Sequence, residues 1–506
     1  MFENKIPMAL GKPFVVWRRE LINGKDLLLI YSMFSKELVE LNTPASIRLL
    51  ELCNGKRSIG EIAALLSSKF NTPVEDVIDD MKKMLNILKK ESIIVFNEED
   101  IEKILPNLLN LKLTDRPFLD YMQKNNLSHL SAPLNVRFLP TMRCFGRCIY
   151  CQAEAGDQAK TFGNEMTTEQ IKRLIKRCYD VGVQSISVLG GEPFLREDMI
   201  EILSYATHLK ISTSVSTNGV LLANREIVKN LANAVNQDYF SLQISIEGSK
   251  PEVHEYLRPG AKFESVVKAI ENALHYKIHT HTNTVLTKAN INDVPNLMCI
   301  LSKLRVKLVA FSQFEPIGCG GIVANDLLLS PYELYQVQNE ILPQLQKQYP
   351  TIHIFAKILE MEFWDEKRTQ PPTDKPIGRC VAGTTDMTIG PDGTVLPCAW
   401  FTGIPEFWAE NALEKDILNI WRDSKIFRKL RNVEIKGKCE HCEFNRSCYK
   451  GCHVLKWALY KDIHIPDPKC WYIPGDRKTI YPPKEVLGTM KPSYQKDLRN
   501  KKGIKG

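Results

Sequence analysis

Three cysteines with the spacing C-x3-C-x2-C stand at Cys144, Cys148 and Cys151, just after an apolar, strand-like run over residues 134–139. Three thiolates can hold a four-iron cluster and leave one iron without a protein ligand, whereas a cluster with four thiolates is mainly an electron carrier. A zinc site is the alternative, but the loop contains no histidine as a fourth ligand. The spacing therefore favours a cluster whose open iron can bind and cleave a substrate or cofactor.

A second group of cysteines lies near the end of the chain. It comprises Cys380, Cys398, Cys439, Cys442, Cys448, Cys452 and Cys470. A zinc ribbon needs only four ligands, so seven cysteines indicate two sites. Fourteen cysteines in 506 residues are too few for a disulfide scaffold, and their clustering is typical of metal ligands in a reducing compartment. Cys53 and Cys178 follow apolar helical patterns instead, and we expect them in the core.

The overall composition is that of a globular protein with two to four domains, 44% hydrophobic and 25% charged. No apolar run approaches the length of a membrane span. Prolines and a lysine interrupt the first 17 residues, so they contain no signal-peptide core. The net charge of +8 comes partly from the lysines of the tail. We therefore expect a cytoplasmic protein that binds neither nucleic acid nor a membrane.

Strand and helix patterns alternate through residues 134–330. Strands are expected at 134–139, 184–189, 211–216, 239–246, 279–286 and 307–314. Six such units predict an α/β fold with a parallel sheet covered by helices, a partial (β/α)6 barrel of the TIM type. Parallel barrels carry their chemistry in the loops after the strands, and the three-cysteine loop follows the first strand.

Polar and glycine-rich motifs follow the next three strands. The candidate ligand-binding residues in them are Gly190, Gly191, Glu192, Pro193, Ser216, Asn218, Ser245 and Arg258. Adjacent glycines let a ligand approach the backbone, and the carboxylate of Glu192 can pair with an ammonium group. Arg258 can hold a carboxylate in a bidentate manner. Each motif alone also has an ordinary explanation, as a turn or as a surface ion pair.

Residues 1–97 read as a separate, winged-helix-like α+β domain. Strand-like runs at 14–21, 27–31 and 37–41 precede three helical patterns and a short strand at 93–96. Start signals at Thr43-Pro44, Ser58-x-x-Glu61 and Thr72-Pro73-x-Glu75 predict the helix N-termini. The remaining segments are a helical linker at 98–133, a helical bridge at 331–379, a cysteine-rich Fe–S domain at 380–475 and a basic tail at 476–506.

The three-cysteine loop and the strand-end motifs together resemble the radical S-adenosylmethionine (SAM) superfamily. The resemblance implies that Cys144, Cys148 and Cys151 hold the cluster that binds SAM. It also implies that Glu192 and its glycines contact the methionyl amine, that Ser216 and Ser245 contact ribose or carboxylate, that Arg258 contacts the carboxylate, and that Tyr150 lies beside the adenine. In such enzymes SAM is cleaved to a 5′-deoxyadenosyl radical, which abstracts hydrogen from the substrate.

The downstream cysteines run C-x(9–15)-G-x4-C, then C-x2-C-x5-C-x3-C, then C, and resemble the SPASM extension of radical SAM enzymes. This implies two auxiliary Fe–S clusters of the [4Fe-4S] type. The distal one would be held by Cys439, Cys442, Cys448 and Cys470, and the proximal one by Cys380, Cys398 and Cys452. Residues 381–397 contain no eighth cysteine, so an open iron, Asp386 and Cys319 all remain candidates for the fourth proximal position.

The N-terminal domain resembles the PqqD-like peptide-recognition domain, in which an exposed strand edge accepts a leader peptide as an added strand. A dimerisation or winged-helix module is the alternative. The three resemblances together imply a maturase of a ribosomally made precursor peptide, which forms a thioether or carbon–carbon cross-link and receives electrons from a flavodoxin- or ferredoxin-like donor. Ala399 after Cys398 counts against a sulfatase maturase, which carries an aspartate there.

Two alternatives to this function remain open. One is another outcome on a peptide or protein, namely epimerisation, excision or side-chain oxidation. The other is a peptide-binding Fe–S protein that transfers electrons without catalysis. The intact three-cysteine loop, the glycine–glutamate motif and Arg258 count against the second alternative.

Overall fold

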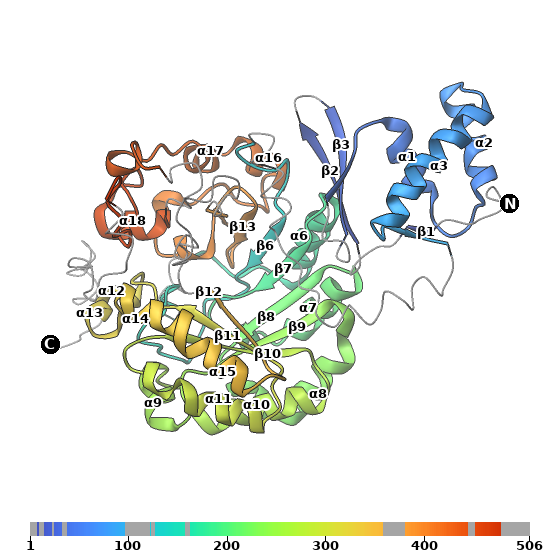
Figure 1. The fold of residues 1–506 in the computed structure, drawn as a ribbon. Helices are drawn as coiled ribbons and strands as arrows, with labels where there is room; N and C mark the ends of the chain where they lie inside the picture. The colour runs from blue at the N-terminus through green and yellow to red at the C-terminus, as the bar shows by residue number, and fades with distance from the viewer. Residues whose placement is uncertain are drawn as a thin grey trace. The chain divides into compact units, whose positions relative to one another are not determined.

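The computed structural model describes residues 8–9, 15–22, 25–32, 38–96, 122, 127–156, 162–357, 380–443 and 451–476. The chain divides into two compact units, Met1–Ala132 and Pro133–Gly506 (Figure 1). Most of the expected linker at 98–133, the second half of the expected bridge, Cys448 and nearly all of the tail lie outside the described residues. No helix in the described ranges is both long and apolar enough to cross a bilayer.

The first unit begins with an antiparallel sheet in the order β2-β3-β4, and three helices follow it. Its elements are β1 (Met8–Ala9), β2 (Val15–Ile22), β3 (Lys25–Ser32), β4 (Leu38–Leu41), α1 (Pro44–Leu52), α2 (Ile59–Phe70), α3 (Val74–Lys90) and β5 (Ile94–Val95). The side chains of Thr43 and Ser58 cap α1 and α2 as predicted. The predicted cap at Thr72 is wrong, because α3 begins after Pro73 and has no side-chain cap.

A nine-stranded sheet in the order β12-β11-β10-β9-β8-β7-β6-β13-β14 forms the centre of the second unit. Its strands are β6 (Asn135–Phe138), β7 (Ser185–Val188), β8 (Ser212–Thr217), β9 (Phe240–Ser245), β10 (Thr280–Leu286), β11 (Leu308–Gln313), β12 (His353–Lys357), β13 (Asp386–Ile389) and β14 (Val395–Leu396). All neighbours are parallel except β13 and β14. The structure thus confirms the α/β class and the six predicted parallel strands.

Three strands of this sheet, β12, β13 and β14, were not predicted. The segment at 331–379 was expected to be a helical bridge, but its described part also contains β12, which pairs with β11 in register from Leu308 opposite His353. On the other side, β13 of the cysteine-rich segment pairs with β6, and Asp386 lies opposite Asn135. The cysteine-rich segment is therefore built directly onto β6, the strand that precedes the three-cysteine loop.

Amphipathic helices cover the strands and bury their apolar stripes against them. They are α6 (Thr168–Asp180), α7 (Met199–His208), α8 (Arg225–Ala234), α9 (Pro251–Leu257), α10 (Phe263–His275), α11 (Val294–Lys303), α14 (Pro331–Gln336) and α15 (Leu342–Gln348). Helices α8 to α11 lie together along one side of the strands (Figure 1). Cys178 lies on the buried face of α6, as expected for a core residue.

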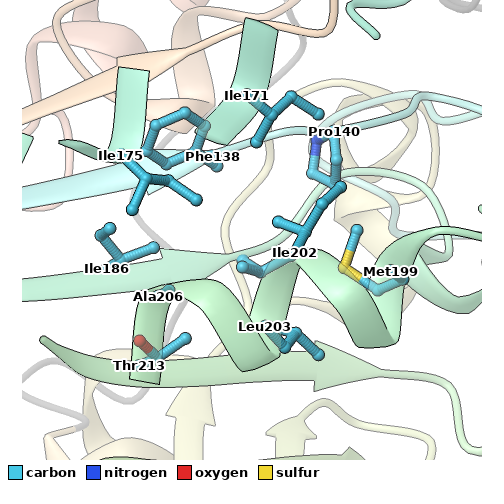
Figure 2. A pocket seen from close by; sticks show the side chains of 11 residues that line it. Phe138, Pro140, Ile171, Ile175, Ile186, Met199, Ile202, Leu203, Ala206 and Thr213 are labelled. Atoms are coloured by element: carbon cyan, nitrogen blue, oxygen red, sulfur yellow. The ribbon is translucent and has the colours of Figure 1, made fainter. Parts of the chain in front are cut away.

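A small apolar space lies between α6, α7 and the strands beneath them. Figure 2 shows Ile171 and Ile175 of α6 near Phe138 of β6, with Ile202 and Met199 of α7 farther along the same space. The lining is almost wholly aliphatic and aromatic. This space is therefore part of the packing that holds the strands, and the candidate site lies elsewhere, at their carboxyl ends.

Candidate active site and cysteine clusters

The three-cysteine loop follows β6 and is held by backbone hydrogen bonds to the segments after β7, β9 and β11. The donor–acceptor pairs are Gly191 N to Thr141 O (2.9 Å), Glu192 N to Arg143 O (2.8 Å), Arg147 N to Pro259 O (2.7 Å), Ile149 N to Leu257 O (3.1 Å) and Cys319 N to Cys151 O (3.0 Å). Satisfied backbone groups of this kind fix an irregular loop in place. The loop is thus supported by three alternate strand ends of the barrel, those of β7, β9 and β11.

The glycines of the Gly190-Gly191-Glu192-Pro193 motif make this close packing possible. A Cβ atom at Gly190 would lie 2.5 Å from the carbonyl oxygen of Thr141, and one at Gly191 would overlap the carbonyl group of Arg143. Gly190 also has a φ of +119°, which side-chain-bearing residues rarely adopt. From the sequence, we expected these glycines to let a ligand approach the backbone. In the structure, the backbone of the three-cysteine loop occupies that space.

The thiols of the triplet lie near one another. A Cβ atom placed on Gly146 would lie 3.5 Å from the sulfur of Cys144 and 3.9 Å from the sulfur of Cys148. Burial, reinforced by the charge of Cys148, raises the pKa of Cys144 to about 11 and that of Cys151 to about 12. These thiols are therefore protonated at neutral pH and would release protons when iron binds.

The donor set of the triplet fits a cluster, because its three members are all thiols and two of them, Cys144 and Cys148, lie near the cationic Arg258. Among the described residues, no three His, Cys, Asp or Glu side chains gather closely enough to hold a single metal ion. Cluster thiolates bind separate iron atoms and stand further apart than the ligands of one ion.

Glu192 joins the ends of β7 and β8. Its carboxylate accepts hydrogen bonds from the Thr217 hydroxyl (2.7 Å) and from the backbone amide of Asn218 (2.9 Å). It is 1% exposed, and burial raises its pKa. The side-chain nitrogen of Asn218 is buried without a hydrogen-bond partner in the described part of the chain. The structure therefore brings two predicted motifs together and leaves an amide donor available beside them.

A second buried network joins the three-cysteine loop to the end of β9. The Tyr150 hydroxyl donates to Oε1 of Glu247 at 2.5 Å, and Nε of Arg258 donates to that oxygen at 2.8 Å and to the Tyr150 hydroxyl oxygen at 2.9 Å. The other oxygen of Glu247 accepts from the backbone amide of Val285 at 2.7 Å. The side chain of Arg258 is 13% exposed and that of Glu247 is fully buried. A surface ion pair, the ordinary explanation of Arg258, is therefore wrong.

Glu247 was not singled out as a functional residue. The signal was present, because it is a carboxylate in an otherwise apolar and small-residue strand end, Ser245-Ile246-Glu247-Gly248. A buried charge of this kind needs a paired cation. Ser245 is buried at the same strand end, and Ser216 is partly buried at the end of β8.

The C-terminal cysteines fall into two spatial sets. Burial raises the pKa of the Cys398 thiol to about 12 and raises the pKa of the Cys452 thiol well above its usual value, and Cys380 adds to both shifts. Burial also raises the pKa of Cys439, and Cys470 and Cys442 add to that shift. We call Cys380, Cys398 and Cys452 the proximal set, and Cys439, Cys442 and Cys470 the distal set. Cys448 lies outside the described residues.

The two named candidates for the fourth proximal ligand have other partners. The carboxylate of Asp386 pairs with Arg137 at 2.7 Å and also accepts from Thr385 and Asn135. Cys319 lies beside the three-cysteine loop, because its backbone amide donates a hydrogen bond to the carbonyl oxygen of Cys151. The charge of Cys319 also contributes to the raised pKa of Cys151.

Three parts of the sequence match known families. Residues 138–298 match the Radical SAM superfamily, residues 380–443 match an iron–sulfur cluster-binding domain (SPASM), and residues 31–94 match coenzyme PQQ synthesis protein D (PqqD). The three matches coincide with the barrel, the cysteine-rich segment and the N-terminal unit.

Individual relatives cover most of the chain. An AdoMet-dependent heme synthase of Methanosarcina barkeri is 28% identical over 69% of this chain and 99% of its own length. The mycofactocin maturase MftC of Mycolicibacterium smegmatis is 27% identical over 70% of this chain and 88% of its own length. The crystal structure of Streptococcus suis SuiB bound to the precursor peptide SuiA shares the fold, with a TM-score of 0.66 and 20% identity, over 92% of this chain and all of that chain. The chain therefore contains a radical SAM domain, with a PqqD domain before it and a SPASM iron–sulfur domain after it, and it is an enzyme that uses SAM and four-iron clusters.

Proposed function

We propose that this enzyme matures a ribosomally made precursor peptide by abstracting hydrogen from it and closing a thioether or carbon–carbon cross-link. The observation that carries the proposal is the PqqD match at residues 31–94 in the same chain as the radical SAM and SPASM matches. A small sheet with a strand edge can bind an extended leader peptide through backbone hydrogen bonds, and the core segment can then reach the barrel. The likeness to MftC and to peptide-bound SuiB supports the same substrate class.

In this proposal, Cys144, Cys148 and Cys151 hold the cluster to which SAM binds. With SAM bound, this cofactor supplies the 5′-deoxyadenosyl radical that abstracts a substrate hydrogen. Glu192 and the backbone of Gly190, Gly191 and Pro193 would receive the methionyl ammonium group. The raised pKa of Glu192 reflects its burial, and a cationic ligand would offset that cost.

The polar groups on the other side of the site would orient the rest of SAM. Glu247 holds the Arg258 guanidinium and the Tyr150 hydroxyl in fixed positions. Arg258 is then oriented to bind a carboxylate, and Tyr150 to lie against the adenine. Ser216, Asn218 and Ser245 would donate or accept hydrogen bonds with the ribose and carboxylate oxygens.

The C-terminal cysteines complete the proposal. The proximal set would hold one auxiliary cluster, and the distal set, together with Cys448, would hold the other. These clusters would accept the electron released when a cross-link closes, and a flavodoxin- or ferredoxin-like protein would supply the electron for SAM cleavage. A cytoplasmic location fits such a donor and thiols that must stay reduced.

The peptide substrate can be tested with short precursor peptides encoded beside the gene. Incubation of the reconstituted, reduced enzyme with SAM and its precursor is expected to yield 5′-deoxyadenosine and a peptide lighter by a pair of hydrogens for each cross-link. Mass spectrometry of the peptide is the readout, and the same core sequence without its leader is the control, which is expected to react poorly. A peptide product of unchanged mass that contains a D-residue would show that the reaction is epimerisation and not cross-linking. SAM cleavage that leaves every precursor unchanged would contradict the peptide proposal.

A further inference from the structure

Lys456 is a fully buried lysine in the cysteine-rich segment. It lies in α18 (His453–Tyr460), which begins directly after Cys452 of the proximal set. The residue is 0% exposed, and its Nζ makes no hydrogen bond with any residue that the structure describes. Removing an ammonium group from water without a partner costs several kcal/mol, so such a group is retained only where another charge compensates it.

The groups that act on Lys456 come from both cysteine sets. Burial lowers the pKa of Lys456, and this shift is opposed by Asp467, Cys439, Cys380 and Cys452. Cys439 belongs to the distal set, whereas Cys380 and Cys452 belong to the proximal set. The ammonium group of Lys456 therefore lies within electrostatic range of both candidate cluster sites.

The local backbone explains this placement. Lys456 and Cys452 are four residues apart, and the amide of Lys456 donates to the Cys452 carbonyl oxygen at 3.1 Å. Residues four apart on a helix lie on the same face, so the lysine projects from the side of α18 that carries the proximal ligand. Asp467 packs against Gly451, where a Cβ atom would overlap its carboxylate.

We propose that Lys456 serves both auxiliary clusters. It donates hydrogen bonds to their sulfur atoms and raises the reduction potential of each. The proposal rests on the assignment of the C-terminal cysteines to two clusters. Reduction of a cluster by one electron adds one negative charge, and a nearby buried cation stabilises the more negative state. Hydrogen bonds to cluster sulfur act in the same direction. One lysine would thus keep both clusters able to accept an electron from the barrel.

The test measures reduction potentials by EPR-monitored titration of the full-length chain. The background carries Cys144→Ala, Cys148→Ala and Cys151→Ala, so that only auxiliary clusters give signals. In this background Lys456→Met is expected to lower the midpoint potential of both signals, with about a tenfold or larger fall in each reduction equilibrium constant, or about 59 mV for a one-electron couple. Lys456→Arg is expected to retain the potentials. Lys461→Met makes the same change at an exposed position at the end of α18 and is expected to have no effect.

Iron content and circular dichroism separate this effect from a loss of structure, and Lys456→Gln provides a second neutral variant. Unchanged potentials in either neutral variant with full iron content would overturn the proposal. Loss of iron from both neutral variants with the fold intact would overturn it too, because Lys456 would then be needed to hold a cluster. If the background protein gives no auxiliary signals at all, the cluster assignment itself fails, and the role of Lys456 fails with it.

Discussion

Cys148→Ala is expected to reduce SAM cleavage to the level measured without enzyme. Cys148 is one of three thiols that would hold the SAM-binding cluster, and its neighbours Cys144 and Cys151 both lie within range of its charge. Two thiolates cannot hold a four-iron cluster that must keep one iron open for SAM. The measurement is the yield of 5′-deoxyadenosine after reconstitution and reduction, together with the iron content of the protein.

Cys178→Ala is the matched control for this change. Cys178 lies in the same domain, on the buried face of α6, and burial raises its pKa to about 12. Removing its sulfur leaves a small cavity that costs about 1 kcal/mol of stability, but SAM cleavage should persist. Equal loss of 5′-deoxyadenosine in both variants would mean that Cys148 supports the fold only. Retained cleavage in Cys148→Ala would contradict the cluster assignment.

Glu247→Ala is expected to destabilise the barrel by about 3–5 kcal/mol, because removing one partner of a buried ion pair leaves the other charge uncompensated. Arg258, Tyr150 and the amide of Val285 would all lose their acceptor. The measurement is the free energy of unfolding from the urea midpoint, supported by hydrogen exchange of the Val285 amide, which should become faster.

Two milder variants in the same network separate charge from packing. Tyr150→Phe removes one hydroxyl and is expected to cost about 1 kcal/mol. Glu247→Gln keeps the shape and one acceptor oxygen but not the charge. Its loss of unfolding free energy should therefore lie between the losses caused by Tyr150→Phe and Glu247→Ala. If Glu247→Ala proves no more destabilising than Tyr150→Phe, the guanidinium of Arg258 has found solvent or another partner, and the network does not fix its position.

Much of the second unit could be predicted from sequence, because its strands are short segments of alternating burial, such as β7 and β10, separated by amphipathic helices. The strand β12 was missed because it follows a helical stretch, and its side chains at positions 353–356 are exposed or only partly buried. The pairing of β13 with β6 joins residues about 250 positions apart, Asp386 and Asn135, and local patterns do not encode such pairings. The helix cap expected at Thr72 failed because Pro73 itself stands at the cap position.

The candidate site was predictable where residue type alone defines the chemistry. The cysteine spacing and the Gly190-Gly191-Glu192-Pro193 motif are of that kind. The partners of Glu192 and Arg258 were not, because Thr217 and Glu247 acquire their roles only when separate strand ends meet. Lys456 was missed for the same reason, since a lysine in an amphipathic helix is ordinarily exposed.

Transfer of a substrate hydrogen to SAM-derived 5′-deoxyadenosine tests the central claim most directly. The precursor is prepared with deuterium at all carbon-bound positions, Cα included, of one residue type at a time, and the 5′-deoxyadenosine formed by the reduced enzyme is analysed by mass spectrometry. The account predicts that one labelled precursor delivers deuterium into 5′-deoxyadenosine, and that the Cys148→Ala enzyme yields neither product. Abundant 5′-deoxyadenosine that carries no deuterium from any labelled precursor would contradict a peptide substrate for this site.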